Sequence, residues 1–124
     1  MKAAIIVLSD PKSGSEEALG RVFNALAAAY DFKAKGEEVT TLFQGAGARW
    51  PGQLADPEHP AHGLYQEVAD TVAGVSKGCA AVFGGAEEAE AAGLDLIGDN
   101  PVPGTPGLPS LQQLISDGFT VLTF

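Results

Sequence analysis

The sequence predicts an α/β fold of three layers, with helices on both faces of a five-stranded, mostly parallel sheet. The first observation is the unbroken apolar run Ala3–Leu8, which is typical of a strand covered on both faces. The second is the helical spacing of apolar residues from Leu19 to Tyr30, with Gly36 as a stop. Because another apolar stretch follows at Val39–Phe43, the simplest arrangement is a right-handed strand–helix–strand unit.

Capping signals mark the first helix and the last one. Ser13 and Glu16 have the spacing of a capping box, in which the hydroxyl and the carboxylate accept hydrogen bonds from free backbone amides. Ser110 and Gln113 repeat the pattern, and Phe119–Phe124 then closes the sheet as its last strand. These signals predict helices that begin near residues 14 and 111.

The region around the only cysteine allows two interpretations. In the first, a helix has its apolar face from Leu64 to Val75, and Cys79–Phe83 is the third strand. In the second, Val72–Ser76 is the third strand and a helix begins near Gly78, with a kink at Gly84-Gly85. Periodicity alone does not choose between them.

Four segments are expected at the carboxyl ends of the strands, where open parallel sheets bind ligands. Two of them are long and irregular, and in compact domains such loops are usually functional. Trp50 and Leu54 indicate that the longer loop packs against the domain. The four segments are Ser9–Ser13, Gln44–His62, the surroundings of Cys79, and Gly98–Leu108, which follows a short strand at Leu94–Ile97.

Length and charge exclude several classes of protein. The chain of 124 residues predicts a single domain, 1–124. Its net charge of −9 disfavours nucleic acids and anionic membranes as partners. No apolar run approaches the roughly 20 residues needed to span a bilayer, and no signal peptide is evident. A lone cysteine forms no internal disulfide, so we expect a cytoplasmic protein.

Cys79 is the first candidate for a functional residue. A free cysteine is often a small buried apolar residue, so a structural role is the alternative. A reactive cysteine needs its thiolate form, which a helix N-terminus and a nearby cation stabilise. The second interpretation of the region supplies the helix end, and Lys77 supplies a cation two residues away.

His59, His62 and Trp50 are candidates to shape access to Cys79. The histidine spacing could suggest a metal, but Pro60 breaks the helix between them and zinc needs three or four protein ligands. We therefore expect no metal and no cofactor. A histidine could instead act as a base near the thiol, and Trp50 could cover a pocket or anchor a subunit contact.

Ser9 and Asp10 precede the first helix, where flavodoxin-like proteins bind a phosphate. Here Glu16 and Glu17 already neutralise the positive end of that helix. Helix capping is therefore the preferred interpretation of this segment.

Several features, taken in order, resemble the DsrE/DsrF-like family, which includes the sulfur-carrying TusD-type proteins of sulfur-relay systems. They are Trp50-Pro51, His59-Pro60, Cys79-Ala80 with Phe83-Gly84, Leu108–Leu111, and the ending Asp117–Phe124. The resemblance covers nearly the whole chain and implies a flavodoxin-like or DsrEFH-like domain that forms trimers or hexamers. It also implies that Cys79 carries a persulfide at the start of a helix after the third strand. Some members have Cys-x-x-Cys there, and Ser76 at the first position argues against dithiol chemistry.

Three functions follow as hypotheses. The first is a sulfur-relay or sulfurtransferase-like protein in which Cys79 takes sulfur from a donor protein and passes it to an acceptor. The second is a non-catalytic, oligomeric module that binds small molecules or partners and has a structural cysteine. The third is a flavodoxin-type binder of nucleotides or flavins.

Overall fold

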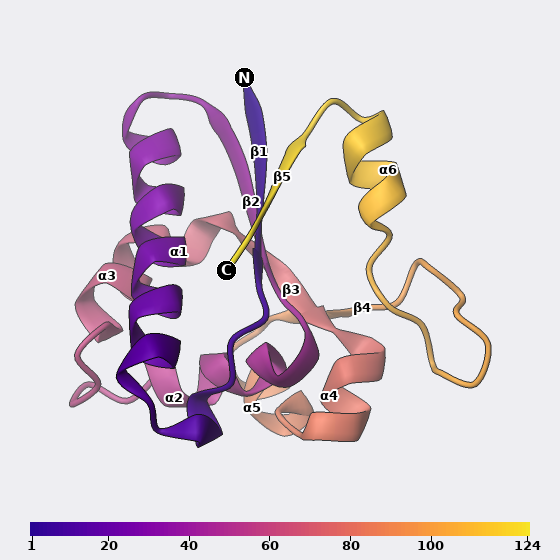
Figure 1. Cartoon of the computed structure of the whole chain (residues 1–124), viewed down its shortest axis with the longest axis horizontal. Helices are drawn as coiled ribbons and strands as arrows, with labels where there is room; N and C mark the ends of the chain where they lie inside the picture. The colour runs from indigo at the N-terminus through magenta and orange to yellow at the C-terminus, as the bar shows by residue number, and fades with distance from the viewer.

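The computed structural model describes residues 1–124 and contains one sheet of five strands, all parallel (Figure 1). The strands are β1 Lys2–Val7, β2 Glu38–Phe43, β3 Val72–Ser76, β4 Asp95–Ile97 and β5 Thr120–Thr123, in the order β4-β3-β2-β1-β5. The helices are α1 Glu16–Ala34, α2 Trp50–Leu54, α3 His62–Val68, α4 Lys77–Phe83, α5 Ala86–Ala91 and α6 Leu111–Ser116. Three short 3₁₀ turns are η1 Pro11–Ser13, η2 Gly45–Arg49 and η3 Ala69–Thr71.

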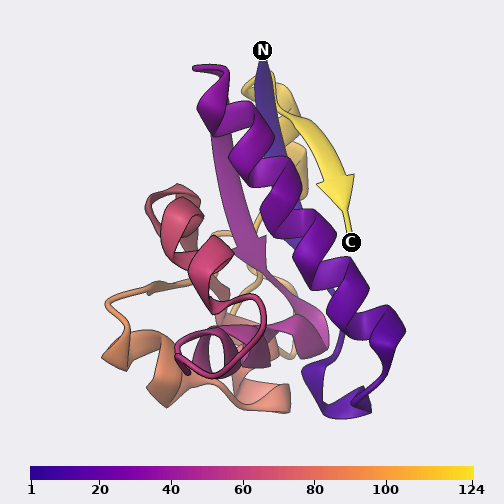
Figure 2. The same ribbon diagram turned by 90° about the vertical axis from the view of Figure 1, so that its left-hand side faces the viewer.

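The connections between strands produce the three predicted layers. From β1 to β4 each strand lies beside the previous one, and the chain then returns past β1 to add β5. Right-handed connections place α1 to α5 against one core and α6 against the other, across the sheet. Figures 1 and 2 show α1 and α6 on opposite sides of the sheet. The larger core, with Ile5, Phe43 and Val75, lies under α1 to α5, and a smaller one lies under α6.

Strand β1 explains the first apolar run of the sequence. It has neighbours on both sides and a core on each face, so its residues from Ala3 to Val7 are all buried. The strand order differs from that of flavodoxin, in which the first strand lies between the second and the third. Here β1 lies between β2 and β5.

The second interpretation of the cysteine region is confirmed. Helix α3 ends at Val68, and Val72 and Val75 belong to β3, so the helix expected to continue to Val75 is wrong. Thr71 ends the helical turns, since its hydroxyl donates to the Val68 carbonyl and also contacts the hydroxyl of Thr41 on β2. The helical spacing of Val68, Val72 and Val75 therefore indicated a helix longer than the one that forms.

The start of α1 also differs from the prediction. Ser15, not Ser13, caps the helix, because its hydroxyl accepts from the Ala18 amide at 3.0 Å. The Ser13 hydroxyl instead lies 3.0 Å from the Ser15 hydroxyl. At α6 the Ser110 cap is confirmed, but the Gln113 side chain donates to Asp117 rather than returning to the cap.

The longer loop packs against the domain, as predicted, and much of it is helical. It forms η2 and α2, with Trp50 and Leu54 buried. Among the helices, none has both the length and the apolar character needed to cross a bilayer.

Gly74 tests the packing of β3 against β4. A Cβ added there would lie 2.3 Å from the Asp95 carbonyl oxygen, so we expect Gly74→Ala to lower the free energy of unfolding by about 1–3 kcal/mol. Gly20 in α1 has open space around its Cα, and Gly20→Ala should raise the free energy of unfolding by about 0.5–1 kcal/mol. Urea unfolding measures both, and equal effects of the two substitutions would contradict this packing.

Candidate functional site

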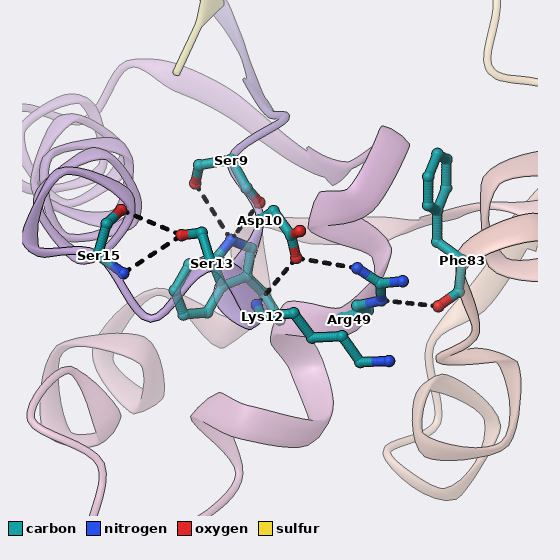
Figure 3. A network of polar contacts seen from close by, with 8 residues as sticks. Ser9, Asp10, Lys12, Ser13, Ser15, Arg49 and Phe83 are labelled. Carbon is teal, nitrogen blue, oxygen red and sulfur yellow. Dashed lines mark hydrogen bonds and ion pairs between the residues drawn. The ribbon is translucent and has the colours of Figure 1, made fainter.

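Arg49, at the end of η2, ties together the segments that follow β1, β2 and β3 (Figure 3). Its Nε donates to the Phe83 carbonyl oxygen at 2.7 Å, and its Nη1 donates to Asp10 Oδ1 at 2.9 Å. Its guanidinium also lies 5.5 Å from the centre of the Phe83 ring. One cation of the second segment, Arg49, thus connects the three segments at the carboxyl edge of the sheet.

Two other contacts bring the predicted segments together. Trp50 Nε1 donates to the Ser9 carbonyl oxygen at 2.8 Å, which joins the second segment to the first. The Gly78 amide donates to the Gly107 carbonyl oxygen at 2.7 Å, which joins the start of α4 to the loop after β4. All four segments therefore meet at one rim, as expected for a parallel sheet.

Cys79 is the third residue of α4, in the first turn after β3. Ser76 caps this helix, and its hydroxyl accepts from the Cys79 amide at 3.3 Å. Cys79 is 8% exposed and belongs to the larger core, whereas Val82 on the same helix is 76% exposed. The helix therefore turns the cysteine inward and presents Val82 to solvent.

Neither histidine forms a hydrogen bond with Cys79. His59 Nδ1 accepts from the Ala61 amide at 3.1 Å, and its ring stands edge-on to Trp50 with centroids 6.0 Å apart. His62 Nδ1 lies 2.7 Å from the Leu54 carbonyl oxygen, so this nitrogen carries the proton. Both rings thus order the turn that leads into α3.

Trp50 and Lys77 occupy different surroundings from those predicted. Trp50 is only 3% exposed and packs within its own chain, so its interpretation as a subunit contact is wrong. Its buried indole N–H needs an acceptor, and Ser9 supplies one. Lys77 is exposed, and its side-chain stem packs near Gly98 in the loop after β4.

Asp10 caps η1 and holds one side of the Arg49 link. The hydrogen bond from the Lys12 amide, together with the Arg49 guanidinium, keeps the pKa of Asp10 below its ordinary value. Ser9 is buried and its backbone accepts from Trp50. Both residues thus have structural partners, in keeping with the capping interpretation.

Sequence reasoning missed Arg49, Lys12 and Phe83 as site residues. Each of the two cations lies in a segment that directly follows a strand. Since the carboxyl ends of parallel strands share one edge, their positions after β1 and β2 were a usable signal. Phe83 could be placed only once the extent of α4 was known.

Comparison of the chain with protein-family models, with curated proteins and with solved structures finds no match. The DsrE-like resemblance therefore stays a prediction from the sequence. No three His, Cys, Asp or Glu side chains lie close enough together to hold a metal ion.

Asp10 gives the site a pH-dependent contribution to stability. A carboxyl whose pKa is lowered by folding stabilises the protein above its ordinary pKa, near 3.8, and loses this effect as pH falls through the lowered value. We expect Asp10→Asn to be less stable than the native chain at pH 7, with the difference shrinking below pH about 3.8.

Thermal unfolding of both proteins between neutral and acidic pH measures this difference. Asp56→Asn is the control, because Asp56 is exposed and forms no ion pair. A difference between native and Asp10→Asn that stays constant with pH would contradict the role given to Asp10.

Proposed function

We propose that the protein is a DsrE-like, sulfurtransferase-like carrier that holds sulfur as a persulfide on Cys79. The observation that carries the proposal is the position of Cys79 in the first turn of α4, directly after β3. This is the position that the sequence resemblance assigns to the sulfur-carrying cysteine. The absence of a second cysteine limits the chemistry to transfer of one sulfur at a time.

The transfer is balanced without an external oxidant or reductant. The Cys79 thiolate attacks the outer sulfur of a donor persulfide, R–S–SH, and forms a new sulfur–sulfur bond. The sulfur–sulfur bond of the donor breaks, and the donor leaves as the thiolate R–S⁻. The same step in the opposite sense delivers the sulfur to an acceptor thiol.

Because Cys79 is buried, this reaction requires a conformational change. At 8% exposure the thiol offers little surface to a donor protein, so the reaction proceeds from an opened state of α4. Helix α4 has only seven residues and is followed by Gly84 and Gly85, both at positive φ. Its short length and the two glycines that follow it favour α4 as the element that opens.

Mass spectrometry of the intact protein tests the carrier. After treatment with inorganic polysulfide or with a desulfurase and its substrate, we expect the native chain to gain the mass of one sulfur atom. Cys79→Ser should gain none, because it keeps the size of the side chain and lacks the nucleophile. The native thiol should also alkylate slowly without denaturant, at a rate set by local opening.

Two results together would contradict the proposal that Cys79 carries sulfur. One is a native chain that gains no sulfur from either donor. The other is a thiol that alkylates only above the urea concentration at which the whole chain unfolds.

A second candidate function is favoured by the burial of Cys79 itself. In it the protein is a non-catalytic binding or interaction module, and the cysteine fills space between α4 and the larger core. This candidate predicts that the chain gains no sulfur and that its thiol alkylates only when the whole chain unfolds. The flavodoxin-type alternative lacks such support, since the strand order is not that of flavodoxin.

We also propose that the chain assembles with copies of itself, in the cytoplasm. Phe23 and Tyr30 support assembly, because they are 44% and 47% exposed on the outer side of α1, two turns apart. A single unpaired cysteine suits a reducing compartment. Native mass spectrometry of the wild type and of Phe23→Ser/Tyr30→Ser tests the assembly, and a monomer for both proteins would refute it.

A further inference from the structure

A polar hollow lies at the same rim, on the outer side of the Arg49 link. It is an open depression of about 360 Å³, lined by residues from η1, η2, α2, α4 and α5. Phe83 is its one apolar lining residue, and Cys79 is not part of it. Its volume is in the range of small-molecule sites, but its lining is unusually charged.

The two cations of the hollow have unused donors. Lys12 forms no ion pair and no side-chain hydrogen bond, although most cations of this acidic chain are paired. Arg49 uses two of its five N–H groups, on Phe83 and Asp10, and is 21% exposed. Figure 3 shows the Lys12 side chain extending toward the side of the network on which Arg49 lies.

The lining of the hollow also includes an acidic side chain. Glu88 of α5 lines it, and its side-chain stem packs over Gly52 of α2. Glu88 and Lys12 line the same hollow, yet they form no ion pair with each other. Two side chains of opposite charge thus line one hollow, and neither has an ion-pair partner.

We propose that this hollow binds a small α-amino acid, with the carboxylate on Arg49 and Lys12 and the ammonium on Glu88. Arg49 is fixed before binding by Asp10 and the Phe83 carbonyl, and its planar fork suits a carboxylate. Gln53, also in the lining, offers amide groups to the rest of the ligand. The charges of Asp10 and Glu88 balance those of Arg49 and Lys12, which favours a zwitterion over a polyanion such as phosphate.

The proposal does not depend on sulfur transfer by Cys79. It assigns a ligand to a cavity outside α4, and binding would be detected equally in the Cys79→Ser variant. A negative result for sulfur transfer would therefore not contradict ligand binding in the hollow, and a negative result for ligand binding would not contradict sulfur transfer.

Titration of the ¹⁵N-labelled chain with each of the protein L-amino acids tests the site. Acetate, methylamine and inorganic phosphate serve as control ligands, because each carries charge of only one sign. We expect at least one amino acid to shift the amides of the residues around Lys12, Arg49 and Gly85, and to bind more tightly than any single-charge probe.

Lys12→Gln and Glu88→Gln test the assignment of the charges. Both side chains are exposed and unpaired, so both variants should fold normally. Each should weaken binding by about tenfold or more, because each removes a charge-assisted hydrogen bond to the ligand. Lys35→Gln and Glu87→Gln change the same charges outside the hollow and should leave the affinity unchanged.

Three results would overturn the proposal. One is the absence of amide shifts around the hollow with every amino acid. Another is unchanged affinity in Lys12→Gln and Glu88→Gln. The third is binding of acetate or phosphate as tight as that of the best amino acid, which would remove any role for Glu88.

Discussion

The carboxyl edge of this sheet depends on the link that Arg49 makes between Asp10 and the Phe83 carbonyl. Strand pairing fixes the strands, but the segments after β1, β2 and β3 share no backbone ladder and need another connection. A guanidinium suits this task because it donates in several directions at once and stays charged at any working pH. Both hydrogen bonds have the charged guanidinium as donor, and such bonds are stronger than those between neutral groups.

The fold was predictable where one physical pattern dominated. Five successive buried residues in β1 can be explained only by a strand with sheet on both sides and cores above and below, and the sequence pattern indicates the same. Near Val72 two patterns coincide, because valines four and three residues apart satisfy a helix while the actual chain is a strand. Thr71 and Gly74 decide between them through contacts with β2 and β4, which sequence spacing does not contain.

The site was predictable only in part, for a related reason. The rule that parallel strands gather their following segments at one edge located the rim, and Cys79 lies beside it at the start of a helix. Whether that cysteine faces solvent depends on which side of α4 packs against η2, and a seven-residue helix has too few turns to show this in its sequence. Lys12 and Arg49 lie far apart in the sequence, and only the strand that each one follows indicates that they meet at the same edge.

Two residues four positions apart on α4 have different surroundings. Cys79 lies in the apolar core, while Phe83, the last residue of the helix, lies at the edge of a charged hollow, and its carbonyl accepts from Arg49. In the carrier that we propose, a protein donor would reach the thiol only when α4 leaves the core. This movement would break the Arg49 hydrogen bond to Phe83 or move Arg49 with it. Under both proposals, a ligand that holds Arg49 in place would therefore oppose the exposure of Cys79.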